Sequence, residues 1–126
     1  MKLNHECVRD LMLYIEENLE YGYLIKVNDV KIKDYSQDEI IYAADKLLEA
    51  GYLDGQKIVT LSDKIPEITI TSITWNGHQF LDNIRDNKVW EHTKSILSKF
   101  SSVSINIISN VAAQVISNLI KTQVGL

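Results

Sequence analysis

The segment from Tyr35 to Leu53, YSQDEIIYAADKLLEAGYL, constrains the fold more than any other part of the chain. Ser36 and Glu39 have the spacing of a capping box, and Gly51 provides a helix stop. Between them, apolar residues recur with helical spacing at Ile40, Ala43 or Ala44, Leu47 and Leu48. The segment therefore predicts an amphipathic helix that leads directly into the sequence after Gly51.

Residues 57–74 are rich in β-branched side chains. Two such runs, KIVTL and ITITSIT, are separated by the polar segment SDKIPE, which contains the only proline. This arrangement predicts a β-hairpin. The alternation of apolar and polar residues fails near Thr71 and Ser72, which predicts a bulge in the second strand.

The rest of the chain contains further helical patterns and one short strand-like pattern. Residues Leu3 to Leu19 place apolar side chains three or four apart, as in an amphipathic helix. The segment YLIKVNDVKIK alternates at Ile25 and Val27 and resumes with Val30 and Ile32, which predicts a strand or hairpin. Helical periodicity returns from Phe80 onward. The predicted order is helix, strand, helix, hairpin, helix.

This order resembles that of a winged helix-turn-helix domain. LLEAGYL is similar to the end of the second helix of such a motif, and ITWNGHQFL resembles the segment that leaves the wing. Thr74 can cap the next helix, and Gly77 can let that helix lie close to a neighbouring backbone. We therefore expect an α+β fold, with a winged helix-turn-helix domain over residues 1–86 and a C-terminal helical extension over residues 87–126.

Over almost its full length the chain also resembles a bacterial and phage family, domain of unknown function 2513. The resemblance rests on YSQDEIIYAADKLLEAGYL, ITWNGHQFLDNIRDNKVWEHTK and the apolar tail after Phe100. It implies a phage or prophage setting and brings no established activity.

Composition fits one globular domain with an appended element, because 45% of the 126 residues are apolar and 24% are charged. Cys7 has no second cysteine to pair with, and Met1 leads into a charged amphipathic segment, so we expect a cytoplasmic protein. The net charge of -4 opposes general attraction to phosphate.

The helix from Ser36 to Ala50 would enter the DNA major groove in a winged helix, yet it carries four carboxylates and one basic residue. DNA binding through the wing is the leading interpretation, by analogy of fold. The candidate DNA-binding residues are Lys26, Lys31, Lys33, Lys46, Lys57 and Lys64. The alternative is a protein-binding module whose acidic helix meets a partner through Asp38, Tyr42, Asp45 and Glu49. The lysines would then protect exposed strand edges.

Catalytic and metal-binding patterns are weak, and we expect no enzyme activity, metal or cofactor. The candidates for a metal site, His5, Cys7, His78 and His92, lack the paired spacing of zinc ligands. Asp82, Asp86 and Glu91 with His78 could indicate acid–base chemistry, but their spacing among apolar residues is typical of a solvated helix face. The segment GYLDG lacks the residues of a phosphate-binding loop. Trp75 and Trp90 are expected to anchor the core.

The tail from Ser101 to Ile120 contains no formal charge. Its apolar stripe, which includes Ile105, Ile108, Val115 and Leu119, needs a covering partner. We expect a homodimer first, packing within the chain second and a membrane span third, because five Ser, three Asn and one Gln interrupt the segment.

Overall fold

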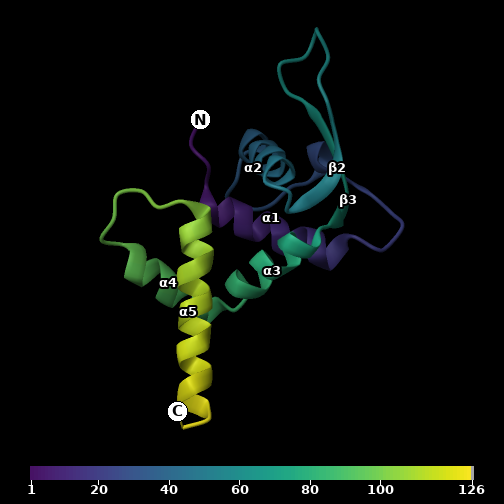
Figure 1. The fold of residues 1–126 in the computed structure, drawn as a ribbon. Helices are drawn as coiled ribbons and strands as arrows, with labels where there is room; N and C mark the ends of the chain where they lie inside the picture. Colours follow the sequence, from purple (N-terminus) through teal and green to yellow (C-terminus); the bar gives the residue numbers. More distant parts are fainter. Residues whose placement is uncertain (126) are drawn as a thin grey trace. The chain divides into compact units, whose positions relative to one another are not determined.

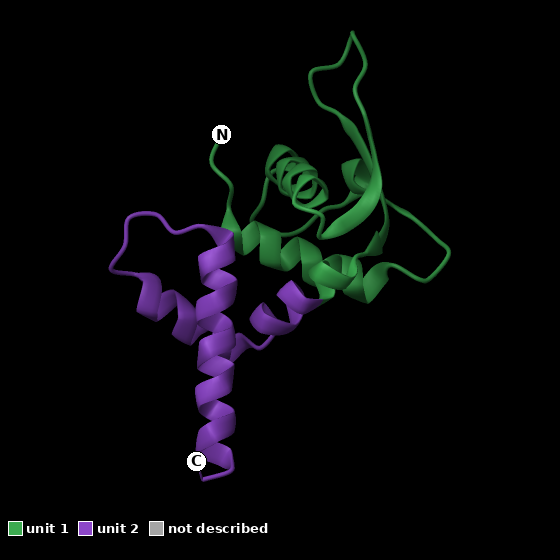
Figure 2. Ribbon diagram, in the orientation of Figure 1, with its two compact units in different colours: residues 1–78 green, residues 79–126 purple. Residues whose placement is uncertain are grey.

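The computed structural model of the protein describes residues 1–125, which form a mixed α+β fold with five α-helices and a three-stranded antiparallel sheet (Figure 1). In chain order the elements are α1 (His5–Asn18), β1 (Ile25–Lys26), the 3-10 helix η1 (Val27–Asp29), α2 (Gln37–Glu49), β2 (Leu53–Ile58), β3 (Glu67–Ile73), α3 (Trp75–Ile84), α4 (Asn87–Leu97) and α5 (Ile105–Gln123). They divide into two compact units, Met1–His78 and Gln79–Leu126, shown in Figure 2. The unit boundary lies within α3, whereas the predicted boundary after residue 86 lies at the break between α3 and α4.

Helices α1 and α2 pack against each other, and each begins at a side-chain cap. The Asn4 side chain accepts a hydrogen bond from the Cys7 amide at 3.1 Å. Ser36 and Glu39 form the predicted capping box at the start of α2. Asn4 also donates to the Glu39 carboxylate at 3.0 Å, and this bond, with that from the Ser36 amide, lowers the pKa of Glu39. The predictions for both helices are confirmed.

The sheet has the order β1-β3-β2, with β3 in the centre. β2 begins at Leu53, earlier than predicted, and pairs with β3 as an antiparallel hairpin. Asp54 pairs with Ser72 and Gly55 pairs with Ile70, so Thr71 is the extra residue of a bulge. The predicted bulge is therefore confirmed.

The prediction of a strand at Val30 and Ile32 is wrong. β1 is only two residues long, and the chain turns after it into η1. The ladder stops because the Ile68 amide of β3 donates to the Asn28 side chain at 2.9 Å and not to a backbone carbonyl of a longer β1. Val30 is buried in the turn that follows, where its amide bonds to the Val27 carbonyl at 3.0 Å.

The connection from β3 to α3 has the predicted cap and close approach. The Thr74 hydroxyl accepts a hydrogen bond from the Gly77 amide at 3.0 Å and donates to the Gly51 carbonyl at 2.6 Å. A side chain on Gly77 would collide with the Tyr52 carbonyl oxygen.

The expectation for Trp75 is wrong, because its side chain is 79% exposed, whereas Trp90 is buried. Trp75 begins α3 and points to solvent, while helical periodicity buries Phe80, Leu81 and Ile84.

In the second unit, α4 and α5 pack against each other. Asp86 caps α4 by accepting from the Val89 amide at 2.9 Å, and Ser104 caps α5. Ile108, Ala112 and Val115 are buried along one side of α5. No helix among residues 1–125 has the length and apolar character needed to cross a membrane.

Candidate functional site

The surface of α2 is acidic, but its charges are largely compensated. Lys57 of β2 reaches Asp45 with an Nζ–Oδ2 distance of 3.0 Å. The Lys46 Nζ atom lies 2.8 Å from Oε2 of Glu49 and 5.5 Å from the centre of the Tyr42 ring. The hydrogen bond and charge of Glu49 raise the pKa of Lys46. These contacts place two of the six candidate DNA-binding lysines in ion pairs with candidate partner-binding carboxylates.

A groove of about 390 Å³ lies between α2 and the β2–β3 hairpin. We call it the α2–hairpin groove, and it is lined by Met1, Asp38, Ile41, Tyr42, Asp45, Lys57, Val59, Lys64, Ile65 and Pro66. The groove joins three of the four predicted partner-binding residues to two of the predicted DNA-binding lysines. Its aliphatic residues are not among the predicted site residues, and the predicted strand over residues 57–61 is only partly correct, because β2 ends at Ile58 and Val59 lies in the loop.

The apolar part of the groove comes from both of its walls. Ile41 is buried on α2, whereas Val59 and Ile65 are exposed on the hairpin loop. Leu61, further along the same loop, is fully exposed. Soluble proteins seldom expose several large apolar side chains together unless the surface binds something. In the sequence, this apolar surface is indicated by the aliphatic residues of KIVTL and by Ile65 in SDKIPE.

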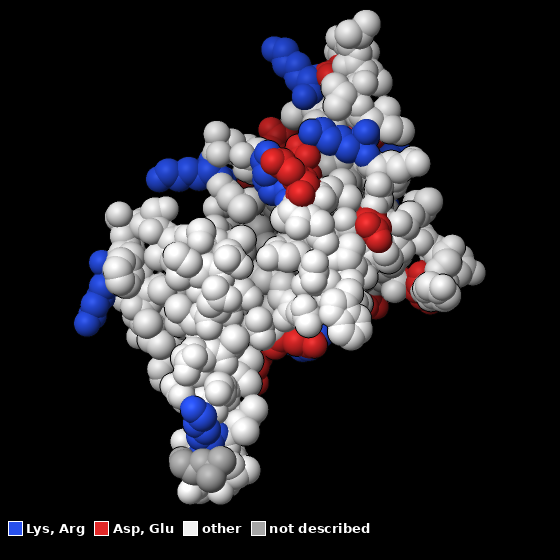
Figure 3. All heavy atoms as spheres, viewed as in Figure 1, with Lys and Arg blue, Asp and Glu red and all other residues white. Residues whose placement is uncertain are grey.

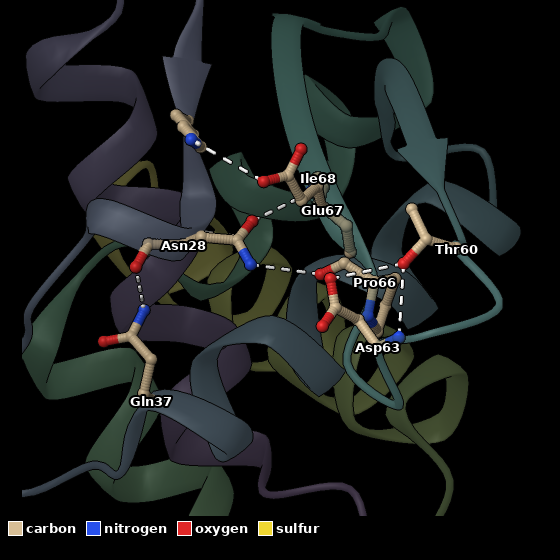
Figure 4. Close-up of polar contacts among 8 residues, drawn as sticks. Asn28, Gln37, Thr60, Asp63, Pro66, Glu67 and Ile68 are labelled. Atoms are coloured by element: carbon tan, nitrogen blue, oxygen red, sulfur yellow. Dashed lines mark hydrogen bonds and ion pairs between the residues drawn. The ribbon is translucent and has the colours of Figure 1, made fainter.

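The hairpin is held beside α2 by Asn28, as Figure 4 shows. The side-chain nitrogen of Asn28 donates to the Pro66 backbone carbonyl at 3.0 Å. The side-chain oxygen of Asn28 accepts from the Ile68 backbone amide at 2.9 Å. Gln37, the first residue of α2, donates to the Asn28 backbone carbonyl at 2.8 Å. Asn28 and Gln37 therefore connect the hairpin base to the start of α2. Neither Asn28 nor Gln37 is among the site residues that the sequence predicts.

The remaining candidate lysines lie outside the α2–hairpin groove. Lys26 of β1 is 3.8 Å from Glu67 at the hairpin base. Lys31 and Lys33 are exposed in the segment between η1 and α2. Within residues 1–125, no ion pair involves Lys31, Lys33 or Lys64. Figure 3 shows acidic and basic side chains next to each other over α2 and the hairpin, so the face in view is not a continuous basic surface.

The residues considered for acid–base chemistry have structural partners. Asp82 forms an ion pair with Arg85, Asp86 caps α4, and Glu91 lies 3.1 Å from Lys94. Burial raises the pKa of the Cys7 thiol to about 11, with smaller contributions from Glu39 and Asp10. Tyr35 donates to Asp10 at 2.7 Å, and burial together with that bond raises the pKa of its hydroxyl.

The four residues considered as metal ligands do not form a metal-binding cluster. In the part of the chain that the structure describes, no three His, Cys, Asp or Glu side chains are arranged to hold a metal ion.

The four residues predicted at a dimer contact fall into two groups. Ile108 and Val115 are buried and Ile105 is partly buried, on the side of α5 that includes Ala112. Leu119 is 52% exposed. Packing within the second unit therefore covers the first part of the stripe and leaves its end in solvent.

Comparison with known proteins identifies a family. An uncharacterized protein of Haemophilus influenzae is 28% identical over 122 residues, which cover 95% of this chain and 99% of that protein. No solved structure matches the chain. The family model described as "Hypothetical protein (DUF2513)" matches residues 2–104, which include every residue that lines the α2–hairpin groove except Met1. The chain therefore belongs to the DUF2513 family.

Proposed function

We propose that this chain is a non-enzymatic module with a winged-helix fold that binds a protein partner in the α2–hairpin groove. The element order supports the winged helix, since α2 leads directly into a hairpin and β1 forms a third strand. On this proposal, η1 corresponds to the first helix of a helix-turn-helix motif and the hairpin corresponds to the wing.

The observation that carries the proposal is the combination of aliphatic residues and compensated charges in one groove. Val59 and Ile65 offer apolar contact area, while Asp45 already neutralises Lys57. Protein interfaces combine an apolar centre with a polar rim, whereas DNA interfaces need unpaired positive charge. The groove resembles the first kind of surface more than the second.

Asp38 gives the groove a preference among protein partners. Its carboxylate is exposed at the start of α2, and no ion pair involves it among the described residues. A partner segment with an apolar side chain for the Val59–Ile65 side and a basic side chain for Asp38 would complement both features.

Site-specific photo-cross-linking in cells tests this function. A cross-linking amino acid at Tyr42 or Ile65 should capture the same protein, because both positions line one groove. The matched control is Glu17, which is exposed on α1 and does not line the groove. Adding Asp38→Lys should reduce capture at Tyr42. Capture of nucleic acid, or equal capture at Glu17, would contradict a protein-binding groove.

DNA binding led by the wing is the second candidate, because Lys64 of the hairpin, and Lys31 and Lys33 of the segment before α2, are exposed and form no ion pair within residues 1–125. The double variant Asp45→Ala, Glu49→Ala distinguishes the two functions. It releases Lys57 and Lys46 and removes two carboxylates, so DNA affinity should increase and depend more steeply on salt if DNA is the ligand. If the groove binds a protein, duplex DNA should bind neither the parent chain nor the double variant. Cross-linking of the double variant to the protein partner should then decrease.

A further inference from the structure

The apolar stripe of α5 is longer than the helix that packs against it. α4 has 11 residues and α5 has 19. At about 1.5 Å per residue, these lengths are roughly 16 Å and 28 Å. α4 can therefore cover little more than half of α5, and the buried residues Ile108, Ala112 and Val115 lie in the first part of α5.

The stripe continues beyond the covered part as Ile116, Leu119 and Ile120. Leu119 continues the row of Ile108, Ala112 and Val115, and Ile116 and Ile120 flank this row, at steps of four residues from Ala112. Ile116 is partly buried, whereas Leu119 is 52% and Ile120 57% exposed. We call these three residues the α5 end patch. It is an apolar surface without a cover in the described structure.

The charge of the segment indicates what covers the patch. In a twofold interface the residues near the axis face their own copies, so a charge there faces the same charge. No formal charge occurs from Ser101 to Ile120, and Lys121 is the first charged residue after the patch. In Figure 3 the visible side of α5 is likewise free of charged side chains until near its C-terminal end.

We propose that the α5 end patch binds the same patch of a second copy of this chain, forming a twofold dimer with Leu119 near its centre. This contact is independent of the α2–hairpin groove. It uses only exposed and partly exposed side chains, so the monomer folds without it. The predicted dimer contact along the whole apolar stripe is therefore reduced, in this proposal, to the last two turns of α5.

Sedimentation velocity on the full chain tests the association. The protein concentration should range from about 5 to about 200 µM, which is on the order of common interface affinities. Over this range the sedimenting mass should rise to twice the 14.4 kDa of one chain. A mass of one chain throughout this range would overturn the proposal.

Charged variants test the place of contact. Leu119→Glu should weaken the dimer on the order of a hundredfold, because it leaves an unpaired charge in an apolar interface. Gln114→Glu adds the same charge on the opposite side of α5, where the side chain is exposed, and should leave dimerisation unchanged. Thermal melting followed by circular dichroism checks that both variants remain folded. Equal dimerisation of Leu119→Glu and the parent chain would overturn the proposal.

Opposite charges at one position test the twofold arrangement. Leu119→Glu and Leu119→Lys should each be monomeric alone, since like charges face each other across the axis. Mixed in equal amounts, they should form a heterodimer through the restored attraction. A mixture that remains monomeric would overturn the placement of Leu119 near the twofold axis.

Discussion

Gly77 occupies a position where adding one methyl group should change stability in the direction opposite to helix propensity. Alanine is preferred over glycine in a helix by about 1 kcal/mol, so propensity alone predicts stabilisation. The added carbon would instead meet the Tyr52 carbonyl oxygen and the Ile73 side chain. Gly77→Ala should therefore lower the free energy of unfolding by about 1–3 kcal/mol, measured by urea denaturation.

The neighbouring Asn76→Ala is the matched control, because Asn76 is exposed in the same helical turn. It should change the free energy of unfolding by less than about 0.5 kcal/mol. A stabilising Gly77→Ala would show that α3 does not need the close approach to Tyr52.

Cys7 should make stability depend on alkaline pH. Burial raises the pKa of its thiol from an ordinary value of 9.0 to about 11 in the folded chain. The stabilisation is complete below pH 9, where the thiol is protonated in both the folded and the unfolded chain, and is lost as the pH rises from 9 to 11, because the unfolded thiol ionises first. The loss is at most about 3 kcal/mol.

Cys7→Ser provides the comparison, because serine does not ionise in this range. Urea denaturation at several pH values should give a steeper fall above pH 9 for the parent chain. Tyr35 is present in both proteins, and Cys7 is the smallest of the causes that raise its pKa, so the contribution of Tyr35 is nearly the same in both. Identical slopes would contradict a raised pKa for Cys7.

At the residue scale, local chemistry was predictable and exposure was not. The cap at Thr74 and the contact at Gly77 follow from the spacing of Thr, Gly and the strand before them. Trp75 lies between these two residues, and its size suggested burial. Whether such a side chain faces the core depends on the rotation of α3, which distant packing decides.

At the element scale, the hairpin depends on Asn28. Asn28→Asp keeps an oxygen that accepts from the Ile68 amide but removes the donor to the Pro66 carbonyl. We expect a loss of about 1–2 kcal/mol in the free energy of unfolding and faster hydrogen exchange at the hairpin base. Nuclear magnetic resonance measures the exchange of each amide.

Gln56→Glu is the control for Asn28→Asp, since it makes the same chemical change at an exposed position of β2. It should leave amide exchange at Ile68 unchanged. If Asn28→Asp also leaves that exchange unchanged, the Asn28 side chain does not hold the hairpin.

Helix α2 and the failed strand after β1 show what a local pattern can determine. The Ser36–Glu39 capping box uses atoms three residues apart, so the sequence contains the whole structure of that helix start. A strand at Val30 and Ile32 would have needed a free partner edge. The Asn28 side chain bonds to that edge at Ile68, and no periodicity in the segment itself predicts this.

At the scale of the whole molecule, the candidate site could be predicted only in pieces. Asp38, Tyr42 and Asp45 were recognised by their charge and helical spacing, and Lys57 and Lys64 by their place in the hairpin. Their assembly into one groove depends on how the hairpin lies beside α2. The ion pair between Asp45 and Lys57 forms only in the folded chain, and no pattern in the sequence predicts it.

Limited proteolysis should reveal the connection between α4 and α5. Lys99 is exposed in the turn after α4, whereas Lys94 lies within α4 and pairs with Glu91. Trypsin should cut after Lys99 well before Lys94, because proteases need locally unfolded chain. Mass spectrometry of a time course identifies the order.

The two fragments should remain together on size exclusion, since Ile108, Ala112 and Val115 hold α5 in the second unit. Immediate separation of the C-terminal fragment would contradict this packing.

The tip of the hairpin is closed by its own side chains. The Thr60 hydroxyl donates to the Asp63 carboxylate at 3.2 Å and accepts from the Asp63 amide at 3.2 Å (Figure 4). No other residue takes part in these two bonds, and the fixed point of the hairpin is its base at Asn28. Substitutions at the tip residues therefore leave the hydrogen bonds that fix the base of the hairpin in place.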